Sequence, residues 1–192
     1  MAQHYKPALR HSAAEPRAPS APASAGAAGQ GSVAREYLAL LGRVAFIALV
    51  TWLLFSQVFL LMRNSGADMF PAVKDGDVVL GFRLQKSFAQ NDAVVYLADG
   101  ERRIGRVIAC EGDVVNITAE GVLTVNGTVQ SGEILYPTYP RDTVSYPYTV
   151  PDGAVFVLAD YRTRAQDSRD FGAVTLADTE AKVIALMRRR GL

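Results

Sequence analysis

The feature that most constrains this chain is an uncharged apolar run of 19 residues, Val44 to Met62, which Arg43 precedes and Arg63 follows. As a helix, the run would be roughly 28 Å long, close to the hydrocarbon thickness of a bilayer. A buried helix of a soluble core and a cleaved secretory signal are the two alternatives. A signal is disfavoured because a long segment precedes the run, and because the run exceeds the usual signal core of about 7–15 residues. We therefore predict a retained membrane anchor.

The charges before this run predict its orientation in the membrane. Basic residues outnumber acidic ones there, namely Lys6, Arg10, Arg17, Arg35 and Arg43 against Glu15 and Glu36. Lysine and arginine are enriched in the cytoplasmic segments that flank membrane helices. We predict a single-pass plasma-membrane protein whose N-terminus is cytoplasmic and whose C-terminal domain is extracytoplasmic.

Composition divides the chain into three segments. Residues 1–34 are rich in Ala, Pro, Ser and Gly and are predicted to form a disordered cytoplasmic tail, because they have too little apolar surface to bury. Residues 35–63 form the predicted anchor, with the span at about 44–62. Residues 64–192 form the predicted extracytoplasmic domain.

The third segment has the pattern of a β protein. Short β-branched runs such as Asp92–Ala98 and Asp113–Thr118 are separated by Gly, Asp and Asn, and Asn126-Gly127 suits a tight hairpin turn. We predict a mostly β fold preceded by a single transmembrane helix and a disordered N-terminal tail.

Composition also excludes several functions. Lys+Arg 20 against Asp+Glu 19 leaves a net charge near zero, so no nucleic-acid partner is predicted. Cys110 is the single cysteine, and both histidines, His4 and His11, belong to the predicted tail. No metal site and no cofactor are predicted, since no cluster of metal-ligating residue types is present at a suitable spacing.

Several motifs follow one another along the predicted domain. They are GADMFP (66–71), DGDVVL (75–80), IGRVIACEGDVV (104–115), the NG turn, and VPDGAVFVLADYRTRAQDSRDFG (150–172). In order and spacing this set resembles the type I signal peptidases, membrane-anchored Ser/Lys peptidases that remove signal peptides, in the compact form typical of Gram-positive bacteria. The resemblance covers about residues 40–192. It implies a signal-peptidase-like β fold in which a peptide lies extended beside the nucleophile.

The resemblance also locates the family's reactive positions, and three of them are changed. The nucleophilic serine falls on Asp68, the lysine that acts as general base falls on Gly105, and a serine that supports this lysine falls on Ala165. A lysine base must be desolvated to titrate near neutral pH, whereas Gly105 has no side chain. Arg103 and Arg106 are close in sequence but remain protonated. The residues therefore favour the absence of Ser/Lys catalysis.

Other uses of the same residues remain open. Asp68 could share a proton with Asp160 or Asp167 in an aspartyl mechanism, or Ser168 could replace the missing nucleophile. The simpler interpretation is that Asp68 is solvated or forms a salt bridge with Arg103 or Arg106. For the motif around Ser168, the simpler interpretation is structural. The positions predicted to be structural are Pro71, Asp160, Asp167, Ser168 and Arg169.

A peptide groove can persist without the reactive residues. The family arrangement implies that free backbone groups on two segments add a ligand as a strand. The predicted peptide-binding residues are Ser65, Gly66, Ala67, Asp68, Met69, Arg103, Ile104 and Gly105. This sequence is similar to a subgroup that lacks the dyad and is associated with assembly of sortase-linked pili.

Three hypotheses follow from this resemblance. The leading one is a catalytically silent homologue that binds extended peptides and assists assembly of pilins or other secreted proteins. Its predicted partners are the lipid bilayer, pilin-type or secreted polypeptides and the sortase-linked assembly machinery. The first alternative is an active signal peptidase I that uses an unorthodox mechanism, and the second is a scaffold whose groove has no role.

Overall fold

The computed structural model describes residues 30–130 and 136–188. Helix α1 (Gln30–Val58) contains most of the predicted span, and its part from Val33 onward is long and apolar enough to cross a membrane. Its side chains are exposed from Val33 to Gln57. Such exposure differs from that of the core helix of a soluble protein and is consistent with a membrane-anchored protein.

The ends of α1 differ from the predicted boundaries. The helix begins at Gln30, so residues 30–34 of the predicted disordered tail are helical, while residues 1–29 lie outside the described part. Strong helix formers in 34–41 (AREYLALL) extend the helix toward the N-terminus. At the other end, Phe59–Met62 belong to a strand. In a run that is apolar throughout, hydrophobic periodicity cannot distinguish a helix from a strand. The residues Phe59–Met62 form a strand because they pair with a second strand.

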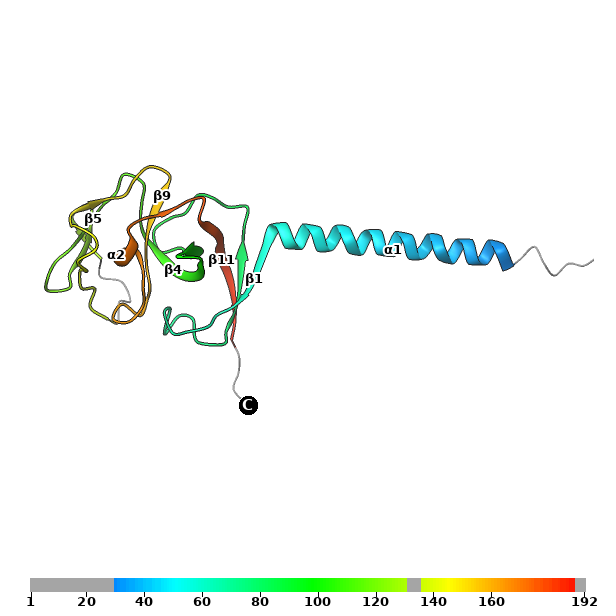
Figure 1. Cartoon of the computed structure of the whole chain (residues 1–192), viewed down its shortest axis with the longest axis horizontal. Helices are drawn as coiled ribbons and strands as arrows, with labels where there is room; N and C mark the ends of the chain where they lie inside the picture. Colours follow the sequence, from blue (N-terminus) through cyan, green and yellow to red (C-terminus); the bar gives the residue numbers. More distant parts are fainter. Residues whose placement is uncertain (1–29, 131–135, 189–192) are drawn as a thin grey trace, which may run out of the picture. The chain divides into compact units, whose positions relative to one another are not determined.

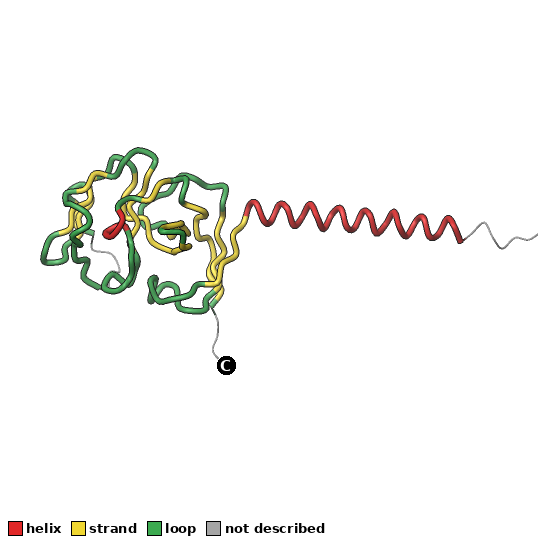
Figure 2. Tube along the Cα trace, viewed as in Figure 1, coloured by secondary structure: helices red, strands yellow, loops and turns green. Residues whose placement is uncertain are grey.

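The rest of the described chain is mostly β. The first strands are β1 (Phe59–Arg63), β2 (Val78–Phe82), β3 (Ala93–Ala98), β4 (Glu101–Cys110), β5 (Val114–Ile117) and β6 (Leu123–Val125). The remaining elements are β7 (Thr128–Val129), β8 (Tyr148–Thr149), β9 (Ala154–Leu158), α2 (Ser168–Phe171), β10 (Val174–Thr175) and β11 (Thr179–Met187). Figure 2 shows these strands joined by connections that range from tight turns to long loops. The mostly β fold predicted from the sequence is confirmed.

Two antiparallel sheets form the β domain. The larger sheet has the order β1-β2-β11-β3-β4-β9-β10, and the smaller has the order β7-β6-β5-β8. Strand β4 lies between β3 and β9 in the larger sheet and near the middle of the β domain in Figure 1. Three of its side chains, Ile104, Val107 and Ile108, belong to three different apolar clusters. Packing on β4 therefore joins the parts of the core.

Two of the strand edges that have no partner in the described structure are relevant to the site described below. β1 lies at the end of its sheet and pairs with β2 alone. β4 pairs with β3 from Glu101 to Arg106, but with β9 only from Arg106 to Cys110. One edge of the segment from Glu101 to Gly105 is therefore free to hydrogen-bond another chain.

Gly81 allows β2 and β11 to lie close together. A Cβ at this position would lie 2.7 Å from the Ala181 Cβ, a distance that real side chains do not adopt. We expect Gly81→Val to lower the free energy of unfolding by about 1–3 kcal/mol through overpacking. Urea unfolding of the full chain in detergent, followed by circular dichroism, would measure the loss. An unchanged urea midpoint would show that β2 and β11 can move apart to accommodate the valine without loss of stability.

Candidate peptide-binding site

A cleft of about 420 Å³ lies between the loop that follows β1 and the first half of β4. It is lined by Met62, Arg63, Asn64, Ser65, Asp68, Glu101, Arg102, Arg103 and Ile104. Four predicted peptide-binding residues thus line one cleft, namely Ser65, Asp68, Arg103 and Ile104. Of the other four, Gly66 and Ala67 are exposed in the same loop, whereas Met69 and Gly105 are buried behind the cleft.

Asn64 holds the loop after β1 in place, a role that the sequence reasoning missed. Its side-chain amide donates hydrogen bonds to the carbonyl oxygens of Gly66, at 3.0 Å, and Lys74, at 3.1 Å. The Gly66 N–H in turn donates to the Asp75 carboxylate at 3.0 Å. Asn64 is only 8 % exposed, and this burial is set by contacts with the turn before β2 that the local sequence does not show. Asn64 is therefore a positioning residue for the cleft wall.

Asp68, which the sequence predicts to stand at the family's nucleophile position, lines the cleft while half-buried. Its main-chain carbonyl accepts a hydrogen bond from the Tyr161 N–H at 2.8 Å. Within the described residues its carboxylate has no hydrogen-bond or ion-pair partner. The guanidinium of Arg103 instead donates to Glu101 and Gln166, each at 2.9 Å. The predicted salt bridge between Asp68 and Arg103 is therefore absent, because closer acceptors surround Arg103.

The other predicted partner, Arg106, also binds a different carboxylate. Its Nε and Nη2 donate to the two carboxylate oxygens of Asp160, at 2.8 and 2.6 Å. This bidentate pair joins β4 to the segment after β9. Asp160 is accordingly held by an arginine and is not available to share a proton with Asp68.

Gly105 is the residue that the sequence predicts to stand at the family's general-base position, and the space in which a side chain would begin is filled. A Cβ built there would lie 2.4 Å from the Val157 Cγ1 and 3.1 Å from the Tyr96 Cε1. Burial raises the pKa of the Tyr96 hydroxyl well above its usual value, helped by the Asp167 charge and opposed by Arg103. Tyr96 therefore stays protonated at neutral pH, and it supplies no base to this position.

Two of the three lysines of the β domain, Lys86 and Lys182, are engaged by other groups. The Lys86 ammonium donates to the Thr179 carbonyl at 2.5 Å, and Lys182 forms an ion pair with Asp92 at 2.8 Å. Lys74 is exposed in the turn before β2. Neither Lys86 nor Lys182 is available to act as a base on a ligand in the cleft.

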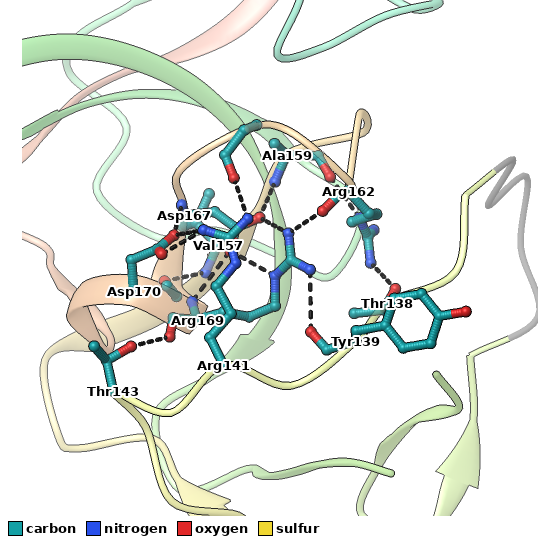
Figure 3. A network of polar contacts seen from close by, with 12 residues as sticks. Thr138, Tyr139, Arg141, Thr143, Val157, Ala159, Arg162, Asp167, Arg169 and Asp170 are labelled. Atoms are coloured by element: carbon teal, nitrogen blue, oxygen red, sulfur yellow. Dashed lines mark hydrogen bonds and ion pairs between the residues drawn. The ribbon is translucent and has the colours of Figure 1, made fainter. Parts of the chain in front are cut away.

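The segment from Ala159 to Asp170, called the late motif here, forms a buried polar network around the start of α2 (Figure 3). Arg169 binds both carboxylate oxygens of Asp167, at 2.9 and 2.8 Å, and the side chains of this pair are 2 % and 0 % exposed. The Ser168 hydroxyl is fully buried and accepts a hydrogen bond from the Val157 N–H at 2.9 Å. Asp167 and Ser168 thus hold the fold together, and neither is placed to act on a peptide.

Ala165 belongs to the same network through its main chain. Its carbonyl oxygen accepts a hydrogen bond from Arg141 at 2.7 Å, and its side chain is 2 % exposed. The neighbouring Gln166 reaches Arg103 in the cleft. The network therefore positions one wall of the cleft, a connection that the sequence did not reveal.

Arg162, which was not among the predicted site or structural residues, ties the long connection before β8 to the rest of the late motif. Its guanidinium donates to the Ala159 carbonyl at 2.5 Å and to the Thr138 hydroxyl at 2.9 Å. Burial lowers the pKa of Arg162 to about 10, although the charges of Asp167 and Asp160 oppose this change. A buried arginine is not distinguishable from a surface arginine by composition.

A pH-dependent part of the stability comes from Asp170. Burial alone raises its pKa, but the hydrogen bond from Arg141 and further donors and charges outweigh burial and lower the pKa below 3.8. A depressed carboxyl pKa stabilises the fold above the unfolded pKa, and this contribution is lost as the pH falls through the folded pKa. We expect Arg141→Met to destabilise the chain more at pH 6 than at pH 2.

Urea unfolding at both pH values would measure this difference. The matched control is Arg102→Met, because Arg102 forms a more exposed ion pair, with Glu180. A loss for Arg141→Met that is equal at both pH values would contradict the linkage to Asp170.

The fold and the cleft together define a class of protein: an apolar helix followed by a β domain whose cleft is bordered by free strand edges. A family model described as "Signal peptidase, peptidase S26" matches residues 35–187. Because this match covers most of the chain, the protein belongs to the peptidase S26 signal peptidase family.

Similar proteins include two from Arabidopsis thaliana. The "Probable thylakoidal processing peptidase 2, chloroplastic" is 30% identical over 148 residues, covering 70% of this chain and 40% of that protein. "Thylakoidal processing peptidase 1, chloroplastic" is 27% identical over 151 residues, covering 70% and 44%. The chain thus spans less than half the length of these curated relatives. A solved signal peptidase I from Enterococcus faecalis V583 has 26% identity and a TM-score of 0.44, covering 52% of this chain and 97% of that chain.

Proposed function

We propose that this protein is a catalytically silent member of its family that binds extended peptides in the cleft. The observation that carries the proposal is the chemistry of the two reactive positions. Asp68 presents a carboxylate where the family has a hydroxyl, and Gly105 presents no side chain beneath Val157 and Tyr96. Removing the nucleophile or the base of a serine peptidase costs about 10⁶ in turnover.

The free strand edges support a binding role for the cleft. The segment from Glu101 to Gly105 has one edge without a strand partner, and this segment supplies most of one cleft wall. An extended peptide can hydrogen-bond to such an edge as an added strand, while pockets for alternate side chains provide specificity. The loop from Asn64 to Asp68 forms the opposite wall.

The proposed cellular role follows from the anchor and the silent cleft. The apolar helix and its basic flank support a plasma-membrane protein with a cytoplasmic N-terminus and an outer β domain. The proposed source, a Gram-positive bacterium, rests on the motif order alone. In that location, a cleft that holds peptides without cutting them would assist assembly of pilin-type or other secreted polypeptides, alongside sortase-linked machinery.

A second candidate is an active signal peptidase that works by an unorthodox mechanism. The observation that favours it is the name of the curated relatives, both of which are processing peptidases. In this candidate, Asp68 would have to be the reactive group, since it is the family's nucleophile position and lines the cleft.

One experiment separates the two candidates. Full-length wild type and Asp68→Asn are purified in detergent and incubated with a preprotein that carries a signal peptide, and products are identified by mass spectrometry. We expect no cleavage above background from either protein. Cleavage by the wild type that Asp68→Asn abolishes would establish the second candidate and overturn the first.

Binding is measured on the same preparations with a fluorescent extended peptide. Ser65→Trp, which fills the cleft, should weaken binding at least about tenfold, because it blocks a wall residue. Ala89→Trp is the matched control, since Ala89 is exposed and does not line the cleft. Equal binding by both variants would contradict a peptide site in the cleft.

A further inference from the structure

We propose that the cleft selects peptides that carry a cationic side chain, lysine or arginine, and that Asp68 binds this side chain. The inference rests on the proposed peptide-binding function and adds the chemical class of the ligand. It comes from one juxtaposition: a half-buried carboxylate without a partner lies in a cleft that is bordered by a free strand edge.

The other charges of the cleft are largely neutralised by one another. Arg102 forms an ion pair with Glu180 at 2.5 Å, and Arg103 forms one with Glu101 at 2.9 Å. Of the charged residues that line the cleft, Arg63 and Asp68 have no ion pair within the part of the chain that the structure describes. Arg63 is exposed and stays hydrated, whereas Asp68 is half-buried.

A bound peptide would make the isolated carboxylate unfavourable. The peptide displaces water from the cleft, and an ionised carboxylate that loses water without gaining a partner raises the free energy of the complex. A lysine or arginine side chain of the ligand would supply charge-assisted hydrogen bonds at that point. A neutral side chain would leave the carboxylate unpaired, and an acidic side chain would be repelled, so both effects favour a cationic ligand.

Arg103 does not cancel this preference. Its Nη2 is engaged by Glu101 and Gln166, and its side chain is 15 % exposed, so it is held against the cleft wall. The charge of Glu101 offsets that of Arg103. The half-buried charge of the cleft that has no ion pair within the described residues is therefore that of Asp68 on the opposite wall.

The test uses full-length protein in detergent and three short extended peptides, capped at both ends and identical except for a central lysine, norleucine or glutamate. Fluorescence anisotropy gives the Kd of each peptide. We expect the lysine peptide to bind about tenfold more tightly than the norleucine peptide, the range of a charge-assisted hydrogen bond, and added salt to reduce this ratio. The glutamate peptide should bind most weakly.

Two variants assign the preference to one carboxylate. Asp68→Asn should bind the lysine and norleucine peptides equally, and Asp68→Lys should prefer the glutamate peptide. Asp99→Asn is the matched control. Asp99 lies in the turn between β3 and β4, outside this cleft, at a φ of 53° that asparagine also adopts. This control should keep the wild-type preference.

The outcomes separate this inference from the proposed function. Equal binding of the lysine and norleucine peptides to wild type would overturn the inference and leave the peptide site intact. A lysine preference that persists in Asp68→Asn would also overturn it. Failure of all three peptides to bind would overturn the peptide site as well.

Discussion

Restoring the family's reactive residues is expected to produce a peptidase only when space is made for the lysine. We expect Asp68→Ser with Gly105→Lys to remain inactive, and the same pair with Val157→Ala to cleave a signal-bearing preprotein. A Cβ at residue 105 would lie 2.4 Å from the Val157 Cγ1. A lysine at this position would therefore force either β9 or its own backbone to shift. Removing the Val157 methyl groups relieves this contact.

The size of the effect follows from the chemistry that is restored. Loss of nucleophile or base costs about 10⁶ in turnover, so even partial recovery should raise cleavage about 10³-fold above that of the wild type. Product formation is measured by mass spectrometry with purified full-length protein. The control keeps Gly105→Lys and Val157→Ala but carries Asp68→Ala, and it should be inactive. Equal activity of the double and triple variants would show that Val157 does not obstruct the lysine.

The second large effect concerns stability. Arg169→Ala is expected to lower the free energy of unfolding by about 3–5 kcal/mol, the range for removal of one partner of a buried ion pair. Arg169 is 1 % exposed and binds Asp167 and the carbonyl oxygens of Arg162 and Tyr139 (Figure 3). Its removal leaves the Asp167 charge buried with fewer partners and leaves two carbonyl groups unpaired.

Thermal and urea unfolding of the full chain, followed by circular dichroism, would measure this loss. Arg102→Ala is the control, because the Arg102 side chain is 47 % exposed and exposed ion pairs contribute about 0–1 kcal/mol. Two variants with equal stability would show that the buried network is not needed for the fold.

These two predictions concern different parts of one architecture. The late motif keeps its buried pair, Asp167 with Arg169, and through Gln166 it reaches Arg103 in the cleft. The reactive positions next to that framework hold Asp68 and Gly105. A fold that keeps its supporting network while its reactive groups are replaced can still present a cleft, which is the basis of the proposed binding function.

Several properties of this protein follow from local sequence. The uncharged run predicts an apolar helix because length and hydropathy are local properties, and β-branched runs predict strands for the same reason. The order of motifs was sufficient to indicate the family. That residue 68 has no hydroxyl and residue 105 has no amine was also visible, because the residue type defines the functional groups of a side chain.

Other properties depended on contacts between residues far apart in sequence. Pairing with β2 places Phe59–Met62 in a strand, although these residues are as apolar as the helix before them. Arg103 and Arg106 bind Glu101, Gln166 and Asp160, so the carboxylate of Asp68 is left alone. The local sequence determines which functional groups a segment contains. Which partners a buried charge has, and which strand edge stays unpaired, depends on how segments that are distant in sequence pack together.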